Sequence, residues 1–344
     1  MNNEYSFIVK LTTKCPWNCK SCINRKENFQ NKKQSDTLFD LELFEDICKK
    51  IKSVWWEHIC LSGWEPTIIN NLEAYIIIAK KNNLITRIVT NGRGITKETM
   101  EKWLILWLDQ VVLSIYWTTP KLVLKTRGNV VIFNKAKNAI AVLKKMKKKY
   151  NFLFIIQTII MKDNYKNLPG IYKTAISANA DLFRPSYLED SAFLPDIRME
   201  REDINIFTKS IIPRMIKITE KAFPSLKQQT EIIRTLKKYY YKKYPNNKYH
   251  TKNYKCKRLG HHLTFYPNWV VDPCPWHEYF PSDAQMSINK NNVNNIISKA
   301  NLEEQMNLSF DYCQFCPQWE HIWINLTREK INEYDKKRKA RLPV

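Results

Sequence analysis

Three cysteines near the amino terminus have the spacing of ligands to one metal centre. They are Cys15, Cys19 and Cys22, in the segment TTKCPWNCKSC. Three thiolates in one short loop can bind three irons of a cubane iron–sulfur cluster and leave the fourth iron open to another ligand. A structural zinc site is the alternative, but it needs a fourth ligand, and no His or Cys follows at a suitable spacing. We therefore expect a 4Fe-4S cluster in this loop.

Further cysteines in the C-terminal third could form a second metal site. They are Cys256, Cys274, Cys313 and Cys316. Four thiolates close either a 4Fe-4S cluster or a zinc site, since their number and spacing do not distinguish the two. Three nearby histidines could be alternative ligands or neighbours of the site, although lone surface residues are the favoured interpretation: His261, His262 and His277.

The nine cysteines follow no secretion signal, which indicates metal or redox chemistry rather than disulfides. Cys48 falls on the apolar side of a helical pattern and Cys60 within a buried-strand pattern. Both are expected to be core residues.

Short apolar runs that alternate with amphipathic segments must position these cysteines. The runs at 7–11, 59–61, 85–90, 111–115, 152–161 and 182–183 are typical of strands, and helical patterns lie between them at 44–51, 69–79, 100–108 and 133–143. This order predicts an α/β fold with a parallel sheet, here a partial, TIM-like (β/α)6 barrel.

The composition changes twice along the chain. We expect the partial barrel over residues 1–195, a helical connector over 196–249 and a small Cys-rich domain over 250–344.

Polar residues follow several of the predicted strands. Glu65 comes after the second, Asn91 ends the third, Ser114 ends the fourth, and Arg127 is expected in the loop beyond it. The carboxyl ends of barrel strands form the face on which such folds build active sites. Taken singly, Asn91 could make a turn, Ser114 could cap a helix and Arg127 could pair with an acid.

Together, the CxxxCxxC loop after the first strand and these strand-end residues resemble the radical S-adenosylmethionine (SAM) enzymes. One departure is Ser21, where many members carry an aromatic residue. The resemblance implies that the open iron binds the amino and carboxylate groups of SAM. An electron from the reduced cluster would then split SAM into methionine and a 5′-deoxyadenosyl radical, which takes hydrogen from a substrate C–H bond.

The resemblance also implies a SAM site. Gly63, Trp64, Glu65 and Pro66 resemble a Gly-Gly-Glu-Pro motif that binds the SAM amino group. Further SAM contacts are expected from Asn91, Ser114 and Arg127, and Gln157 and Arg184 are candidates to line the pocket.

The C-terminal segment CKRLGHHLTFYPNWVVDPC resembles the start of the SPASM and twitch extensions of that family, where two cysteines bracket a hairpin beside an auxiliary cluster. The resemblance favours one auxiliary 4Fe-4S cluster, with zinc as the alternative, and a peptide or protein substrate. An RNA or nucleotide substrate, or a non-catalytic metal-binding protein, are the rival interpretations. No room for a leader-peptide-binding domain is expected before the first strand.

The net charge is +23, from 56 basic and 33 acidic residues. Such an excess can attract nucleic acid, but no motif of stacking aromatics accompanies the lysine runs, and a lysine-rich composition is also what an AT-rich genome produces. The charge would suit an acidic electron donor, a flavodoxin or ferredoxin. Without a signal peptide or spanning segment, the expected location is the cytoplasm, away from membranes.

Tryptophan stands where the backbone favours glycine at several positions. The chain has 6 glycines, against roughly 24 expected at typical usage, and 11 tryptophans. Our hypothesis is that the host reads UGA as glycine whereas the written sequence reads it as tryptophan. The positions concerned are Trp56, Trp64, Trp107, Trp117 and Trp269. The alternative is that these are true tryptophans and that the SAM pocket is degenerate.

Overall fold

The computed structural model describes residues 6–17, 19, 22, 37–54, 57–187, 197–222, 262–272, 286–298 and 301. Six parallel strands are adjacent in the sheet in chain order. They are β1 (Ser6–Lys10), β2 (His58–Ser62), β3 (Ile85–Thr90), β4 (Gln110–Ser114), β5 (Leu153–Ile160) and β6 (Leu182–Tyr187). The predicted partial barrel is confirmed.

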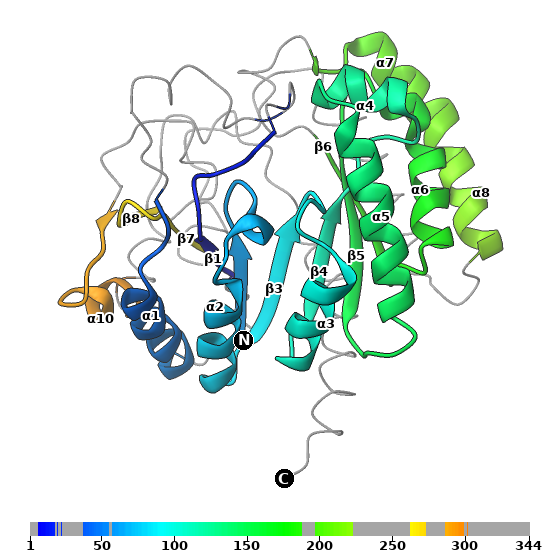
Figure 1. The fold of residues 1–344 in the computed structure, drawn as a ribbon. Coiled ribbons are helices and arrows are strands. Elements are labelled where there is room, and N and C mark those ends of the chain that lie inside the picture. The colour runs from blue at the N-terminus through cyan, green and yellow to red at the C-terminus, as the bar shows by residue number, and fades with distance from the viewer. Residues whose placement is uncertain are drawn as a thin grey trace.

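Helices follow the strands and pack against one face of the curved sheet (Figure 1). They are α1 (Leu41–Ser53), α2 (Leu72–Lys81), α3 (Lys97–Ile105), α4 (Pro120–Arg127), α5 (Val131–Met146) and α6 (Leu168–Ser177), with short 3-10 helices η3 (Pro66–Ile68) and η4 (Tyr165–Asn167). Helices α4 and α6 were not predicted. The α4 helix starts at the cap Thr119, whose side chain accepts the Leu122 N–H, and ends at Gly128 in the left-handed conformation.

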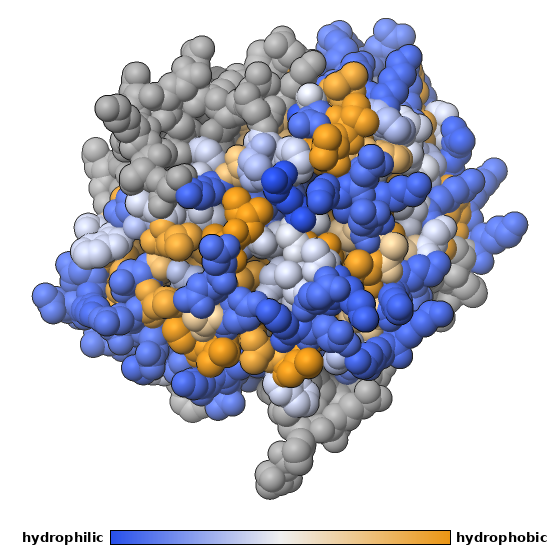
Figure 2. All heavy atoms as spheres, viewed as in Figure 1, coloured by the Kyte–Doolittle hydropathy of each residue, from blue (hydrophilic) through white to orange (hydrophobic). Residues whose placement is uncertain are grey.

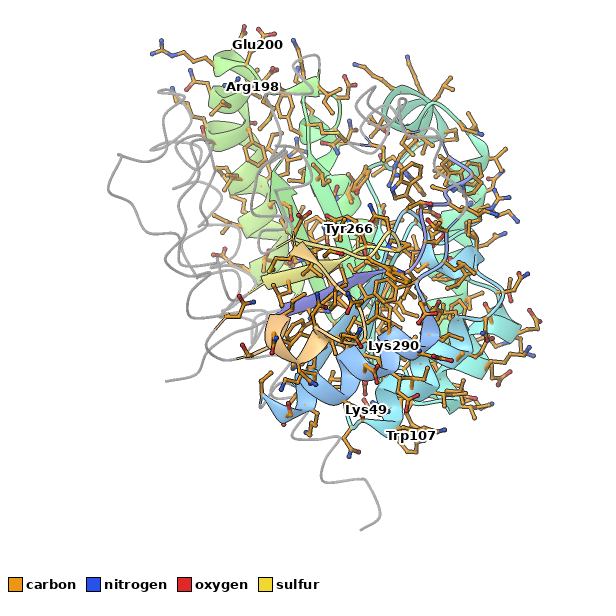
Figure 3. All side chains as sticks on the ribbon, turned by 90° about the vertical axis from the view of Figure 1, so that its left-hand side faces the viewer. Lys49, Trp107, Arg198, Glu200, Tyr266 and Lys290 are labelled. Carbon is orange, nitrogen blue, oxygen red and sulfur yellow. The ribbon has the colours of Figure 1, made fainter. Side chains whose placement is uncertain are left out.

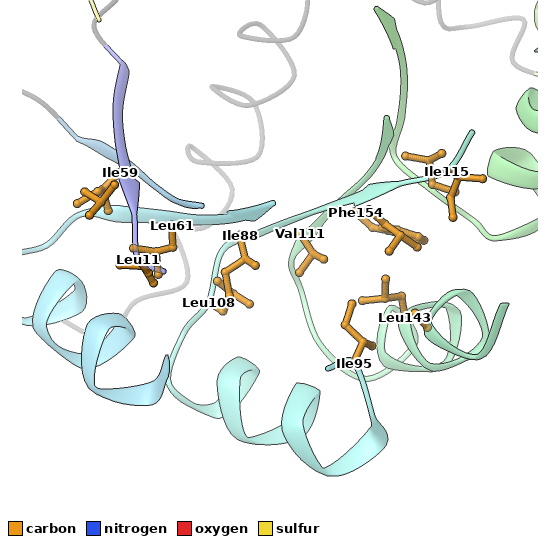
Figure 4. Packing of buried hydrophobic residues seen from close by; sticks show 14 of the residues in the cluster. Leu11, Ile59, Leu61, Ile88, Ile95, Leu108, Val111, Ile115, Leu143 and Phe154 are labelled. Atoms are coloured by element: carbon orange, nitrogen blue, oxygen red, sulfur yellow. The ribbon is translucent and has the colours of Figure 1, made fainter. Parts of the chain in front are cut away.

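The strands bury both faces, but with different residues. On the outer face, Leu61, Ile88 and Val111 point toward the helices, where they meet side chains such as Leu143 of α5 (Figure 4). A second, smaller apolar cluster of Val112, Leu153, Ile155 and Leu182 fills the inner face. Successive strand residues point to opposite faces, and β4, β5 and β6 each supply buried residues to both clusters.

The sheet continues beyond β1 into the C-terminal part of the chain. Strand β7 (His262–Phe265) pairs in parallel with β1, and β8 (Val270–Asp272) and β9 (Met286–Ser287) follow as antiparallel neighbours. Phe7 and Phe265 stack across this junction with ring centroids 5.9 Å apart. The described C-terminal strands thus share the barrel's sheet, although the sequence analysis placed them in a separate domain. The domain boundary itself remains a prediction.

The predicted connector is helical where it is described. It contains α7 (Arg201–Ile206), one π-helical turn η6 (Phe207–Ile211) and α8 (Ile212–Ala222), and α8 packs beside α6. A last short helix, α10 (Val293–Ile296), packs near α1.

Hydrophilic side chains predominate on the helical face, with scattered hydrophobic residues between them (Figure 2). No helix in the described part of the chain is long and apolar enough to cross a membrane.

Two aspartate–lysine pairs bind the amino ends of strands to the preceding helices. Asp109, 2 % exposed, accepts the Thr86 N–H at 2.8 Å and pairs with Lys80 Nζ at 2.8 Å. The second pair repeats this arrangement: Asp181 accepts the Phe154 N–H at 2.7 Å and pairs with Lys147 at 2.8 Å. Each lysine also donates to a backbone carbonyl, of Leu84 or Phe152.

Asp109→Ala should destabilise the fold by about 3 kcal/mol, because it removes the buried carboxylate that lies 2.8 Å from the largely buried Lys80 ammonium. Glu45→Ala is the control, since Glu45 and Lys49 form an exposed pair at 3.1 Å whose loss costs about 0.5 kcal/mol or less. Urea unfolding of both variants measures the difference. Equal losses would show that the Asp109 pair has no special weight.

Candidate functional site

Backbone hydrogen bonds join the start of the cysteine loop to the end of β2. The Leu11 N–H donates to the Ser62 carbonyl at 2.9 Å, which extends the β1–β2 pairing by one residue. Beyond it, the Trp64 N–H donates to the Thr12 carbonyl and the Glu65 N–H to the Lys14 carbonyl, each at 3.1 Å. The chain that leads into Cys15 is therefore fixed against the residues expected to bind SAM.

Gly63 makes this close approach possible. Its φ is +121°, in a region that L side chains rarely adopt, and a Cβ at this position would lie 2.7 Å from the Thr12 carbonyl oxygen. A larger residue at 63 would push the two segments apart. By contrast, φ of Trp64 is not in the left-handed region, and its side chain is half-buried.

The three cysteines of the loop lie in a water-poor environment. Cys19 is 3 % exposed, Cys15 and Cys22 are half-buried, and the Cys22 N–H donates to the Cys19 carbonyl at 3.0 Å. Burial raises the pKa of Cys15 to about 12, and the charges of Glu65, Cys19 and Cys22 act in the same direction against the hydrogen bond from the Trp17 backbone. Thiols that share a buried loop in this way become stable thiolates once metal neutralises them.

No three His, Cys, Asp or Glu side chains among the described residues are grouped as ligands of a single metal ion. This spacing does not conflict with a cubane cluster, in which each cysteine binds a different iron. The three thiols can therefore still bind three irons of one cluster.

Glu65 connects three segments at the carboxyl end of the sheet. It is 1 % exposed, and its Oε1 accepts hydrogen bonds from Thr67 N–H at 3.2 Å and from the hydroxyls of Thr67 and Thr90, each at 2.5 Å. Its Oε2 accepts the Asn91 N–H at 2.7 Å. Burial raises the pKa of Glu65, and these hydrogen bonds oppose that shift.

Three of these bonds end on Oε1 and one on Oε2, so Oε2 can still accept a further hydrogen bond. Glu65 thus holds the surrounding backbone in place, and a role for its carboxylate in binding SAM stays a prediction.

Asn91 extends this network to the cysteines. Its Oδ1 accepts the Arg93 N–H at 3.0 Å, which closes the turn after β3, and its Nδ2 lies 3.9 Å from Cys15 Sγ. Asn91 thus makes the turn and also contacts the cysteine loop.

Arg127 lies beside Cys19. It is on the last turn of α4, not in a loop as expected, and is 8 % exposed. Its Nη1 donates to Cys19 Sγ at 3.1 Å, and its guanidinium carbon lies 4.1 Å from the centroid of the Tyr116 ring. Its buried Nε–H has no hydrogen-bond partner among the described residues. A buried donor without a partner fits a site where an anionic group binds.

The other candidate residues form a row on the inner face of the barrel. Ser114, Gln157 and Arg184 are in register on β4, β5 and β6, and Arg184 Nη2 donates to Gln157 Oε1. The Ser114 hydroxyl makes no hydrogen bond with another described residue. This polar row lies above the apolar inner cluster, toward the carboxyl ends of the strands.

Basic side chains surround Cys60 on the same inner face. Burial raises the pKa of this thiol, and the charges of Arg87, Arg184 and Lys10 oppose the shift. Arg87 Nε also donates to Gln110 Oε1 at 2.8 Å. Cys60 and Cys48 are both buried, as predicted for core residues.

Several of these supporting residues were missed from the sequence: Thr67, Thr90, Tyr116, Lys10 and Arg87. Arg87 could have been found, because a charged residue inside the buried strand ITRIVT is expected on the face away from the packed helices. Thr90 carries no such signal, because its partner Glu65 lies 25 residues away in the chain, whereas Thr67 is only two residues from Glu65.

Some predicted residues lie outside the described part of the chain. They are Cys256, Cys274, Cys313, Cys316, His261, His277 and Trp56. Of His262 only the backbone is described, at the start of β7.

Glu65→Gln should lower the free energy of unfolding by about 2 kcal/mol, because the new amide NH2 faces N–H and O–H donors that need an acceptor. The exposed Glu45→Gln is the matched control. Chemical denaturation of both variants measures the loss. A Glu65→Gln protein as stable as the control would contradict the role assigned to this carboxylate.

Comparisons with known proteins agree with this geometry. Residues 9–175 match the Radical SAM superfamily. A 113-residue segment is 28 % identical to the PqqA peptide cyclase of Methylocella silvestris, and it covers 33 % of this chain and 29 % of that protein. The chain thus matches less than a third of the length of this curated relative.

Two solved structures share the fold. SuiB from Streptococcus suis, bound to the precursor peptide SuiA, superposes with a TM-score of 0.63 at 15 % identity, over 92 % of this chain and 70 % of SuiB. The anSMEcpe protein with bound AdoMet superposes with a TM-score of 0.61 at 15 % identity, over 91 % of this chain and 88 % of that protein. From the end of β1 to α6, over residues 9–175, the chain is a radical SAM domain.

Proposed function

We propose that this protein is a radical SAM enzyme that cleaves SAM reductively at a 4Fe-4S cluster bound by Cys15, Cys19 and Cys22. We further propose that it modifies a C–H bond of a peptide or protein. When bound, the cluster and SAM together supply a 5′-deoxyadenosyl radical that takes a hydrogen atom from the substrate.

The anchored cysteine loop is the observation that carries this proposal. Thr12 and Lys14 are hydrogen-bonded to residues 64 and 65, and Asn91 and Arg127 contact two of the cysteines. The chain thus holds the cluster ligands at the carboxyl face of the barrel and limits their contact with water. A free zinc knuckle on a surface loop would need none of these contacts.

In this proposal the strand-end residues orient SAM. Backbone groups at 63–65 and the side chains of Asn91, Ser114 and Arg127 are its proposed contacts. The Ser114 hydroxyl and the buried Arg127 Nε–H, neither of which has a hydrogen-bond partner among the described residues, support this role, because both can donate to a carboxylate.

The proposal of a peptide substrate is based on two similar proteins. One is a PqqA peptide cyclase, and SuiB was solved with the precursor peptide SuiA. The polar row of Ser114, Gln157 and Arg184 lies on the inner face, where a substrate side chain would reach the site from the barrel mouth.

We also propose one auxiliary 4Fe-4S cluster, bound by Cys256, Cys274, Cys313 and Cys316, and a flavodoxin or ferredoxin as the electron donor. The β7–β8 hairpin at 262–272 supports the auxiliary site, because it lies between the first two of these cysteines along the chain. A cytoplasmic location fits these oxygen-sensitive groups and remains part of the proposal.

The test is anaerobic reconstitution with iron and sulfide, followed by reduction with dithionite in the presence of SAM. Wild type and Trp64→Gly should both bind iron at the loop, and at least Trp64→Gly should release 5′-deoxyadenosine. Cys22→Ala should lose this activity, whereas the control Cys48→Ala, which removes a fully buried thiol of α1, should keep it.

No 5′-deoxyadenosine from reduced, iron-loaded Trp64→Gly protein would contradict the proposal and leave a metal-binding scaffold. Equal activity of Cys22→Ala and Cys48→Ala would also contradict it.

A further inference from the structure

The buried charge of Arg127 lacks a carboxylate partner among the described residues. Its nearest polar partner is Cys19, 3.1 Å from Nη1, and its guanidinium lies over the Tyr116 ring. Burying a charged group is unfavourable unless the charge is paired. A protonated Cys19 would compensate little, whereas a metal-bound Cys19 thiolate would compensate fully.

The stacking on Tyr116 gives the guanidinium one orientation. A ring 4.1 Å from the guanidinium carbon is within the range of a favourable cation–π contact. Tyr116 is itself held, because its carbonyl accepts Asn164 Nδ2 at 3.3 Å. The charge is thus fixed beside one sulfur of the predicted cluster.

We propose that Arg127 is a positioning residue that raises the reduction potential of the cluster bound by Cys19. Reduction adds one negative charge to the cluster, and a buried cation on a ligand sulfur stabilises the reduced state more than the oxidised state. This inference rests on the proposed function, since it requires the cluster. It differs from a SAM contact because it acts before SAM binds.

The test is an EPR-monitored redox titration of reconstituted protein without SAM. Arg127→Met, which keeps length but removes charge, should shift the midpoint potential to more negative values. Arg127→Lys and Tyr116→Leu should shift it less, and Tyr116→Phe should leave it unchanged. Arg93→Met is the matched control, because Arg93 lies 4.6 Å from the ring centroid of Trp17, a residue of the cysteine loop, and makes no hydrogen bond to a sulfur among the described residues.

An unchanged midpoint in Arg127→Met would overturn the inference. If Arg127→Met binds no cluster, the test falls to Arg127→Lys and Tyr116→Leu. Unchanged midpoint potentials in both of these variants would also overturn the inference. Failure of wild type to bind a 4Fe-4S cluster would instead refute the proposed function.

A separate observation concerns the identity of two residues. Among the described residues, four that are not glycine have φ in the left-handed region: Asn83 at 55°, Asn179 at 57°, Trp107 at 65° and Trp269 at 65°. Asparagine tolerates this conformation, whereas a bulky residue there is an outlier.

Trp107 occupies the same helix-ending motif as the two asparagines. After each of these three residues the helix ends, and the N–H of the next residue donates to the carbonyl five residues before it. The three bonds run from Leu84 to Ala79, from Leu108 to Trp103 and from Ala180 to Ala175, at 3.0 to 3.1 Å. This motif usually places glycine, and sometimes asparagine, at the left-handed position. The end of α4 uses Gly128, with φ of 76°.

Trp269 occupies the corresponding position of a hairpin. Its N–H donates to the Tyr266 carbonyl at 3.0 Å, and the Tyr266 N–H donates to the Val270 carbonyl at 2.9 Å. This pattern is a three-residue loop with a left-handed bulge residue, a position at which glycine is strongly preferred.

Packing does not compensate for either conformation. Trp107 is 55 % and Trp269 51 % exposed. Figure 3 shows Trp107 at the periphery, at the opposite end of the molecule from Glu200. Trp103, in contrast, is 3 % exposed within α3 and has helical geometry.

The geometry points to glycine at positions 107 and 269 in the protein as its host makes it, through a UGA codon that the host reads as glycine. The scarcity of glycine, 6 against 11 tryptophans, agrees with such recoding. The φ argument does not extend to Trp64 or Trp117, because neither has a left-handed φ, and Trp117 packs against Phe133 with ring centroids 4.9 Å apart.

Two measurements test this inference. The gene should carry UGA at codons 107 and 269 but UGG at codon 103, and peptide mass spectrometry of protein from the host should find glycine at 107 and 269. Tryptophan in those peptides would overturn the inference.

Recombinant variants give an independent readout. Trp107→Gly and Trp107→Asn should raise the Tm of the written sequence, whereas Trp107→Ala should not, because alanine also resists the left-handed conformation. Trp103→Gly, the buried control, should lower it. An equal rise with Gly and Ala would show that exposure of the indole, not backbone conformation, causes the effect, and would remove the structural basis of the inference.

Discussion

The buried carboxylate of Glu65 is the interaction on which the rest of the site depends. Its two oxygens accept hydrogen bonds from η3, from the end of β3 and from the turn beyond it, so one side chain fixes the relative positions of these segments. The same residue's N–H holds the Lys14 carbonyl at the start of the cysteine loop. Without an acceptor at position 65, the buried donors of Thr67, Thr90 and Asn91 would lose their partner, and the backbone beside the cysteine loop would be held less firmly.

The two ends of the barrel have separate tasks. At the amino ends of the strands, Asp109 and Asp181 pair with lysines of the preceding helices and contribute stability. At the carboxyl ends, the cysteine loop, Asn91 and Arg127 lie together and form the candidate active site. This division allows the strained residue at 107, between α3 and β4, to affect stability while lying far from the site.

Local sequence patterns predicted the six strands because each buried strand is an apolar run between helical patterns. The same patterns missed α4, although Thr119, Pro120 and Gly128 are its start and stop signals, and so placed Arg127 in a loop. The pairing of β7 with β1 and the contact of Arg127 with Cys19 join residues far apart in the chain, which periodicity does not report. The helix-end and hairpin positions of Trp107 and Trp269 correctly predicted a left-handed backbone, whereas Trp64 and Trp117, chosen by resemblance to related enzymes, do not have one.

Mössbauer spectroscopy of iron-reconstituted protein, with and without SAM, tests the central claim most directly. Three loop cysteines that leave one iron of a cluster open should give a 4Fe-4S spectrum in which SAM changes the signal of one iron site. A spectrum without a 4Fe-4S cluster, or one that SAM leaves unaltered in Trp64→Gly protein, would contradict the account.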